Sequence, residues 1–232
     1  MFANVRAVAF DLDNTLWDIE PVLVRAEMRL FEWLRANCPR ITERLSIEDM
    51  RAARAQLARN EPHKAHDLTY LRMSALARHA REHGYEEEMA ERAFAVFFAA
   101  RNELELFADV RPALERLRAR YALASLSNGN ADLVRIGLAE LFTVSLSARH
   151  IGAAKPHPLC FERLAGELGC TPREIMYVGD DPLLDVAAAR ACGLSTAWMN
   201  RRGLPWPSSL EPADLVISDC AELACALDGG DA

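Results

Sequence analysis

Side chains that could do chemistry gather at four places in this sequence of 232 residues. They are, in chain order, Asp11 with Asp13, Ser127 with Asn128, Lys155, and Asp180 with Asp181 and Asp185. Alone, each group is typical of a turn, a helix cap or a solvated surface residue. Their joint occurrence, each at or after the end of an apolar run, favours one polar site over four unrelated turns.

The residue types of these groups suit the transfer of a phosphoryl group. Carboxylates that are brought together repel one another, so a cation is expected among them. Oxygen ligands without His or Cys suit Mg²⁺. Lys155 would add positive charge, and Ser127 and Asn128 could donate hydrogen bonds to phosphate oxygens. Such a site could neutralise the charge that moves with a phosphoryl group.

The spacing of Asp11 and Asp13 would allow the two carboxylates to take different roles in one reaction. In an extended chain, side chains two residues apart leave the same face, with Leu12 turned to the other. One carboxylate could then attack phosphorus while its neighbour handles the proton of the leaving group.

Short apolar segments that alternate with helical ones must position these residues. The first predicted strand is Val5–Phe10. The others are Leu123–Leu126, Val144–Leu146, Ile175–Val178, Ser195–Trp198 and Leu215–Ile217. This alternation predicts an α/β fold with a doubly wound, Rossmann-like parallel sheet. The carboxyl ends of its strands line the ligand crevice, which is where the polar groups fall.

The alternation of strands and helices is interrupted between about residues 20 and 105, where the composition changes. The stretch is rich in Ala, Leu, Arg and Glu, which favour helices. Pro39 and Pro62 divide it, and Ser46 to Asp49 has the spacing of a helix start. We expect an all-helical domain over residues 17–106, inserted into an α/β core formed by residues 1–16 and 107–232.

Composition restricts the partners and the compartment. The formal net charge is −7, which gives no electrostatic reason to bind nucleic acid or an anionic membrane. The longest apolar run, Phe94–Ala100, is far below the about 20 residues that cross a bilayer. No signal peptide is visible, so a cytoplasmic location is expected. The six cysteines form no C-x-x-C pair, which predicts reduced thiols.

The polar groups also resemble the four motifs of the haloacid dehalogenase-like (HAD) hydrolases. The matching segments are Phe10 to Leu16, Ser127-Asn128, Lys155-Pro156, and Gly179-Asp180 followed by Asp185. The insertion between the first two motifs resembles the helical C1 cap of subfamily I. The resemblance implies a HAD core with this cap.

The resemblance also implies a role for each matching residue. Asp11 would be the nucleophile that forms an aspartyl-phosphate, and Asp13 the general acid and base. Ser127, Asn128 and Lys155 would hold the phosphoryl oxygens. The implied cofactor is Mg²⁺, bound by Asp11, by the backbone carbonyl of Asp13 and by Asp180. The residues implied to support the site from around it are Asp185, Asp181 and Thr15.

Asp13 separates the activities found in such a family. Haloacid dehalogenases resemble this chain in their motifs but lack an acid at that position, whereas a carboxylate there suits hydrolysis of a phosphomonoester. The expected substrate is a small phosphorylated metabolite, and the chain would act as a monomer or a homodimer. A phosphomutase, a 2-haloacid dehalogenase, and a phosphate-sensing or protein-binding module without catalysis remain as alternatives.

Three segments resemble a narrower group, the bacterial phosphatases that act on FMN and on the riboflavin precursor 5-amino-6-(5-phosphoribitylamino)uracil. They are Phe10–Asp18, His66–Thr69 and Ser127–Asn130, whereas Lys155–Pro158 departs from that group and Trp198–Gly203 looks more like general members of the subfamily. In a capped enzyme the cap meets the leaving group. The candidates for substrate specificity are therefore Trp17, Asp18, His66, Asp67 and Tyr70.

Overall fold

The computed structural model describes residues 2–229, which form two compact units. Of the described residues, an α/β unit contains residues 2–18, 105–129 and 137–229, and a helical unit contains residues 19–104 and 130–136. Each unit has a core of its own.

The α/β unit is built on a six-stranded parallel sheet in the order β3-β2-β1-β4-β5-β6. Its strands are β1 (Ala7–Phe10), β2 (Ala122–Ser127), β3 (Val144–Ser147), β4 (Ile175–Gly179), β5 (Ser195–Met199) and β6 (Leu215–Ile217). All six lie where the sequence predicts them, with no end shifted by more than two residues. The predicted α/β fold with a doubly wound parallel sheet is confirmed.

The strand order brings the ends of two central strands together. β1 pairs with β2 on one side and with β4 on the other, with Phe10 opposite Ser125 and Val178. The chain runs outward from β1 through β2 to β3, and then returns to add β4, β5 and β6 on the other side. The order therefore reverses between β1 and β4, and such a switch point is where open α/β sheets bind ligands. Asp11 and Asp180 are the residues that follow these two strands.

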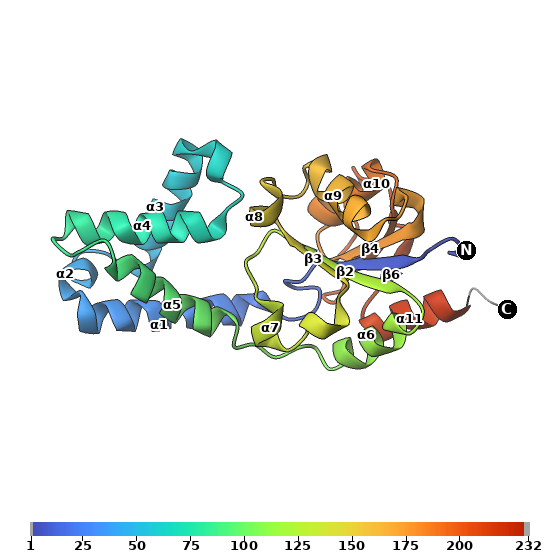
Figure 1. Ribbon diagram of the computed structural model, residues 1–232, viewed down its shortest axis with the longest axis horizontal. Coiled ribbons are helices and arrows are strands. Elements are labelled where there is room, and N and C mark those ends of the chain that lie inside the picture. The colour runs from blue at the N-terminus through green and yellow to red at the C-terminus, as the bar shows by residue number, and fades with distance from the viewer. Residues whose placement is uncertain (1, 230–232) are drawn as a thin grey trace. The chain divides into compact units, whose positions relative to one another are not determined.

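Helices cover both faces of the sheet (Figure 1). α9 (Pro158–Leu168) and α10 (Ala188–Ala191) pack on one face, and α6 (Val110–Arg118) and α11 (Cys220–Asp228) lie on the other. Phe161 and Leu164 of α9 join Ala9, Leu126 and Ile175 of the strands in one apolar core. Burial on both faces explains why the central strands are almost wholly apolar. The short elements of this unit are η2 (Ala139–Leu141), α8 (Ala148–Ile151), η3 (Pro172–Glu174) and η4 (Pro182–Ala187).

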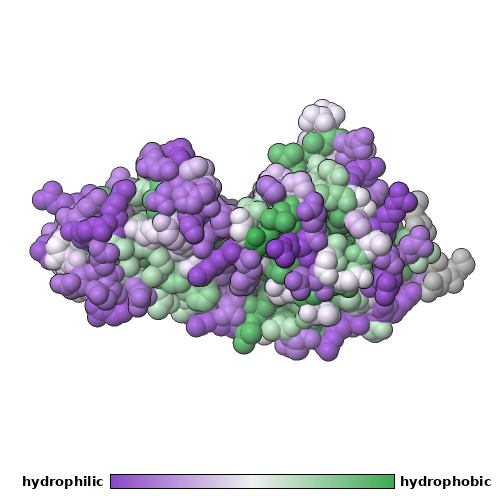
Figure 2. All heavy atoms as spheres, turned by 45° about the horizontal axis from the view of Figure 1, so that its top comes forward, coloured by the Kyte–Doolittle hydropathy of each residue, from purple (hydrophilic) through white to green (hydrophobic). Residues whose placement is uncertain are grey.

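The helical unit is a bundle of amphipathic helices around its own core. Its elements are α1 (Ile19–Asn37), α2 (Pro39–Thr42), α3 (Ile47–Asn60), η1 (Pro62–Lys64), α4 (Leu68–Glu82), α5 (Met89–Arg101) and α7 (Leu133–Ile136). Leu34, Leu76 and Phe97 are among the residues buried between them. Ser46 and Asp49 form the predicted capping box at the start of α3. Hydrophilic side chains dominate the face of this unit drawn at the left of Figure 2.

Residues 130–136 belong to the helical unit although they lie between two strands of the sheet in the sequence. The sequence alone places them in the α/β part for that reason. In the structure, two hydrogen bonds connect this segment to the rest of the helical unit. Asn102 accepts from the backbone N–H of Asp132 at 2.8 Å, and the Asn130 amide donates to the Thr69 hydroxyl at 3.1 Å.

Two further expectations concern the cysteines and membrane-spanning segments. All six cysteines are free thiols in the structure. Among residues 2–229, no helix combines the length and the apolarity that crossing a bilayer requires.

Candidate active site

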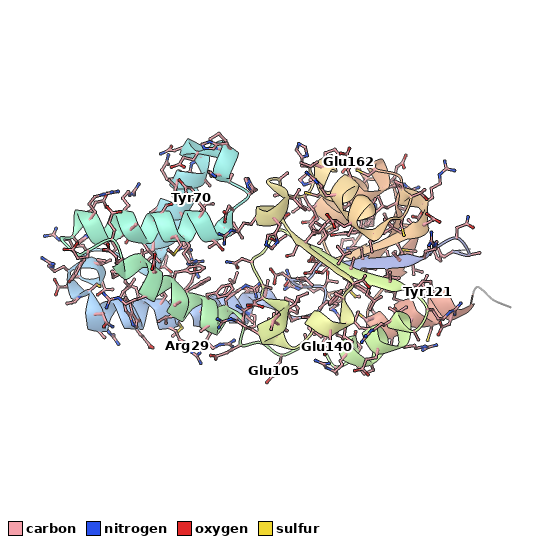
Figure 3. All side chains as sticks on the ribbon, in the orientation of Figure 1. Arg29, Tyr70, Glu105, Tyr121, Glu140 and Glu162 are labelled. Atoms are coloured by element: carbon pink, nitrogen blue, oxygen red, sulfur yellow. The ribbon has the colours of Figure 1, made fainter. Side chains whose placement is uncertain are left out.

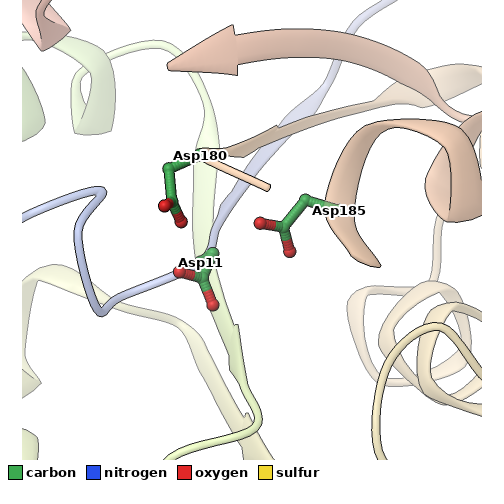
Figure 4. A group of neighbouring side chains, drawn as sticks. All are labelled: Asp11, Asp180 and Asp185. Carbon is green, nitrogen blue, oxygen red and sulfur yellow. The ribbon is translucent and has the colours of Figure 1, made fainter. Parts of the chain in front are cut away.

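Three carboxylates converge at the carboxyl ends of β1 and β4. Asp11, Asp180 and Asp185 each offer an oxygen, and these oxygens all lie within 4.8 Å of one another (Figure 4). Asp11 and Asp185 are buried, and Asp180 is partly buried. The structure thus joins the first and the last polar group of the sequence at the switch point of the sheet.

Lys155 lies between two of these carboxylates. Its Nζ donates to Asp11 Oδ1 at 2.6 Å and to Asp185 Oδ1 at 2.5 Å, and its side chain is only 2% exposed. Burial opposes the charge on Lys155, but Asp11 and Asp185 outweigh that cost and hold the pKa of the lysine well above its ordinary value. The lysine is therefore a permanent positive charge at the base of the site.

Tyr177 is a site residue that the sequence analysis missed. Its hydroxyl donates to the backbone carbonyl of Leu126 at 3.1 Å and accepts from Lys155 Nζ at 2.9 Å. The side chain is completely buried in β4, and burial raises the pKa of its phenol well above the ordinary value. The available signal was a hydroxyl in an otherwise apolar, fully buried strand, because a buried Tyr needs a hydrogen-bond partner.

Asn128 holds the backbone of Lys155. Its amide nitrogen donates to the carbonyl of Lys155 at 3.0 Å, and its amide oxygen accepts from the N–H of the same residue at 2.8 Å. Ser127, the last residue of β2, accepts from the N–H of Gly129 at 2.9 Å through its hydroxyl oxygen. Asn128 therefore positions Lys155, whatever further contact it makes with a substrate.

The loop after β1 carries Asp13, Thr15 and Trp17. Asp13 Oδ1 accepts from the indole N–H of Trp17 at 2.8 Å, and the Thr15 hydroxyl lies 3.5 Å from Asp11 Oδ2. Asn14 has a φ of +63°, a conformation that Asn tolerates better than most residues. Trp17 is completely buried in the α/β unit. It therefore contacts the proposed acid and base instead of lying open to a substrate.

The turn after β4 depends on a close approach that only glycine permits. A Cβ added at Gly179 would overlap the side chain of Asp185. Asp181 caps η4, since its carboxylate accepts from the N–H groups of Leu183 and Leu184, both at 2.8 Å. The N–H of Asp181 in turn donates to Asp185 Oδ2 at 3.0 Å. Both oxygens of Asp185 thus have protein donors.

The electrostatics of the site favour a bound cation. Burial, and then the neighbouring Asp185 and Asp181, raise the pKa of Asp180 to about 7. Burial also raises the pKa of Asp11 well above its ordinary value, against the opposing effect of Lys155. A cation would remove both penalties, and the all-oxygen donor set of the three carboxylates fits Mg²⁺.

The remaining specificity candidates lie in both units. In the helical unit, Asp67 caps α4 by accepting from the N–H of Tyr70 at 2.9 Å. The hydroxyl of Tyr70, which is labelled in Figure 3, donates to Glu61 at 2.7 Å. His66 is partly exposed beside them. In the α/β unit, the exposed Asp18 lines a cavity of about 200 Å³ that Asp180 also borders.

The sheet order, the switch point and the buried Asp–Lys–Asp arrangement define a hydrolase of a known class. The family model for haloacid dehalogenase-like hydrolases matches residues 5–193, and the chain belongs to that family. Among curated proteins, the chain is 29% identical to the 5-amino-6-(5-phospho-D-ribitylamino)uracil phosphatase YigB of Escherichia coli, over 95% of both chains. It is 34% identical to phosphoserine phosphatase of Thermus thermophilus, over 62% of this chain and 60% of that protein.

Among solved structures, the fold is similar to that of 2-haloacid dehalogenase from Pseudomonas syringae pv. Tomato. The TM-score is 0.92, with 31% identity, 97% of this chain covered and 99% of the other. The relatives thus include phosphatases as well as dehalogenases.

Proposed function

We propose that the chain is a Mg²⁺-dependent phosphomonoester hydrolase that works through an aspartyl-phosphate on Asp11. The observation that carries the proposal is the buried contact of Asp11 with Lys155, with a second carboxylate, Asp13, two residues along the same loop. The named phosphatases among the relatives support the same function.

In the first half of the proposed reaction, an oxygen of Asp11 attacks phosphorus and the ester P–O bond breaks. Asp13 gives its proton to the departing alkoxide. Lys155, held in place by Asp185, Tyr177 and the Asn128 amide, stays charged and stabilises the negative charge on Asp11 and on the phosphoryl group.

In the second half, Asp13 takes a proton from water as that water attacks phosphorus, and the bond between phosphorus and Asp11 breaks. Mg²⁺, bound by Asp11, Asp180 and the backbone carbonyl of Asp13, would neutralise charge on the phosphoryl oxygens. Asp185 supports Lys155 in this scheme, since both of its oxygens already accept from protein donors. Ser127 and Thr15 are proposed to hold the phosphoryl group and the nucleophile loop.

A 2-haloacid dehalogenase is the second candidate, because the solved structure with a TM-score of 0.92 belongs to such an enzyme. Asp13 argues against it. A halide leaves as a stable anion and needs no proton, so a carboxylate aligned by the Trp17 indole would have no task in that reaction.

For the substrate we propose a small phosphorylated metabolite. The first compounds to test are FMN and 5-amino-6-(5-phospho-D-ribitylamino)uracil, the compound in the name of YigB. The similarity to YigB over 95% of both chains supports this choice. We further propose that the helical unit is a cap and that His66, Asp67 and Tyr70 contribute to specificity from it.

One panel tests the proposed function. Phosphate release is measured from sugar phosphates, nucleotides, FMN, the riboflavin precursor and p-nitrophenyl phosphate, with Mg²⁺ and with EDTA, beside chloride release from 2-chloropropionate. We expect phosphate release that EDTA abolishes and added Mg²⁺ restores. Chloride release without phosphate release would establish the dehalogenase instead.

A further inference from the structure

Trp17 has an unusual combination of burial and polar contact. It is the largest of the fully buried side chains, with 0% of its surface exposed. Its only polar hydrogen, on Nε1, is donated to Asp13 Oδ1 at 2.8 Å. The indoles of Trp198 and Trp206 instead donate to the backbone carbonyls of Asp180 and Leu210. Trp17 therefore directs its hydrogen bond at a carboxylate to which a step of the reaction is assigned.

The backbone of the loop fixes the two residues relative to one another. The N–H of Asn14 donates to the carbonyl of Trp17 at 2.7 Å, and that of Leu16 donates to the carbonyl of Leu12 at 2.8 Å. The N–H of Phe107 adds a third bond, to the carbonyl of Leu16 at 3.1 Å. The indole is thus anchored by packing and by its own loop, whereas the Asp13 side chain is only partly buried.

The chemistry of an indole gives this contact a direction. An indole N–H can donate a hydrogen bond but cannot accept one. It therefore bonds best to the carboxyl oxygen that carries no proton. When Asp13 is in its acid form, the bond from Trp17 to Oδ1 favours placing the proton on Oδ2.

We propose that Trp17 is a positioning residue for general acid catalysis: its indole N–H fixes Oδ1 of Asp13 and directs the acidic proton, on Oδ2, toward the leaving group. The inference rests on the proposed phosphatase function and adds to it a residue that acts through Asp13. It also gives Trp17 a task different from the substrate specificity expected of it from the sequence.

The test compares two esters that differ in their need for an acid. An alkyl phosphate leaves as a strongly basic alkoxide and needs the proton of Asp13, whereas p-nitrophenolate leaves readily without one. Trp17→Phe removes the N–H and keeps a buried ring. Since general acid catalysis contributes about 10²–10⁴-fold, we expect Trp17→Phe to lower kcat/KM for the alkyl ester by about 10–100-fold. For p-nitrophenyl phosphate we expect a loss of less than about threefold, because little proton transfer is needed.

Matched controls separate positioning from packing. Trp206→Phe removes the indole of a partly buried tryptophan of the same unit and is expected to leave the ratio of the two kcat/KM values unchanged. In an Asp13→Asn background, Trp17→Phe is expected to add no further selective loss on the alkyl ester. Should Trp17→Phe not fold, Trp17→Tyr takes its place, because a phenol fills the site without a donor at the position of Nε1; the same split is expected.

Three outcomes would overturn the inference. An equal loss on both esters would show that Trp17 only supports the fold of the loop, and no loss on either would show that the hydrogen bond is dispensable. If the wild-type protein hydrolyses neither ester, the proposed function itself fails and the inference falls with it. This last result is distinct, because it is seen before any variant is made.

Discussion

Lys155 Nζ lies 2.6 Å from Asp11 Oδ1, and both side chains are buried although 144 residues separate them in the chain. Asp185 Oδ1 lies 2.5 Å from the same nitrogen. One ammonium group therefore serves two carboxylates in a place from which water is largely excluded. A buried charge is tolerated only when it is paired, so the three residues depend on one another.

Removal of the lysine charge is expected to damage both stability and activity. Lys155→Met leaves Asp11 and Asp185 without their shared cation, and breaking a buried ion pair costs about 3–5 kcal/mol of unfolding free energy. Urea unfolding of the metal-free protein measures this loss. Lys64→Met, an exposed lysine of the helical unit, is the matched control and is expected to change the unfolding free energy by less than about 0.5 kcal/mol. A wild-type unfolding curve for Lys155→Met would show that the pair does not stabilise the fold.

The Tyr177 hydroxyl is expected to matter for catalysis as well as for folding. Tyr177→Phe removes one hydrogen bond to Lys155 Nζ and one to the Leu126 carbonyl, which should lower the unfolding free energy by about 1–3 kcal/mol. Tyr121→Phe is matched to it, since Tyr121 (labelled in Figure 3) is a buried tyrosine that donates to the Leu227 carbonyl at 3.2 Å. We expect kcat to fall by about tenfold only in Tyr177→Phe, through a displaced lysine. Equal kcat values for the two variants would contradict this role.

A substitution at Gly179 tests whether the close approach of this residue to Asp185 matters. In Gly179→Ala the new Cβ would overlap the Asp185 side chain and must push that carboxylate away from Lys155. We expect a stability loss of about 1–3 kcal/mol, as for other overpacked sites, together with a large loss of kcat. Gly166→Ala provides the control, because a Cβ at this position of α9 meets nothing within 4 Å. Its expected effect is neutral or stabilising by up to about 1 kcal/mol.

Metal affinity is expected to depend on pH through Asp180. In the metal-free protein the pKa of this carboxyl is raised from 3.8 to about 7, chiefly by burial. Protons therefore compete with Mg²⁺ below pH 7, and the affinity should weaken as the pH falls through that value. Calorimetric titration with Mg²⁺ on both sides of pH 7 measures the effect. An affinity that does not change with pH would contradict it.

The same shift has a consequence for folding. Because the folded state holds the proton of Asp180 more tightly than the unfolded chain does, the metal-free protein should lose stability as the pH rises from about 4 to about 7. Mg²⁺ should offset this loss, since it binds the charged carboxylate of the folded state. Asp180→Asn should weaken both effects. Thermal unfolding with and without Mg²⁺ across this range provides the measurement.

The sequence predicts the sheet well because the central strands are buried on both faces and therefore almost wholly apolar. Val5 illustrates the small errors: it is apolar and buried, but the strand begins only at Ala7. The convergence of Asp11, Lys155 and Asp180 could also be predicted, since parallel strands end at one edge of a sheet.

Other features depend on contacts that no local pattern encodes. Tyr177 differs from a core tyrosine only in what surrounds its hydroxyl, which comes from segments far away in the sequence. The spacing of Asn128 and Lys155 does not reveal that the amide of one holds the backbone of the other. Residues 130–136 follow the helical unit through Asn102 and Thr69, which are 30 and 61 residues from their partners.

The role of Trp17 could not be predicted from its position in the sequence. It stands next to the start of the helical unit, which makes contact with a leaving group a reasonable expectation. Its burial and its bond to Asp13 are properties of the folded loop, and they favour a role in aligning the acid.

The most direct test of the proposed mechanism is to trap the intermediate on Asp11. The enzyme is mixed with its best phosphate ester and Mg²⁺, quenched in acid within one turnover and digested, and its peptides are examined by mass spectrometry. The mechanism predicts a phosphoryl group on Asp11 in the wild type, and neither this adduct nor turnover in Asp11→Asn. Turnover with a phosphoryl group on another residue, or sustained hydrolysis by Asp11→Asn, would contradict the mechanism.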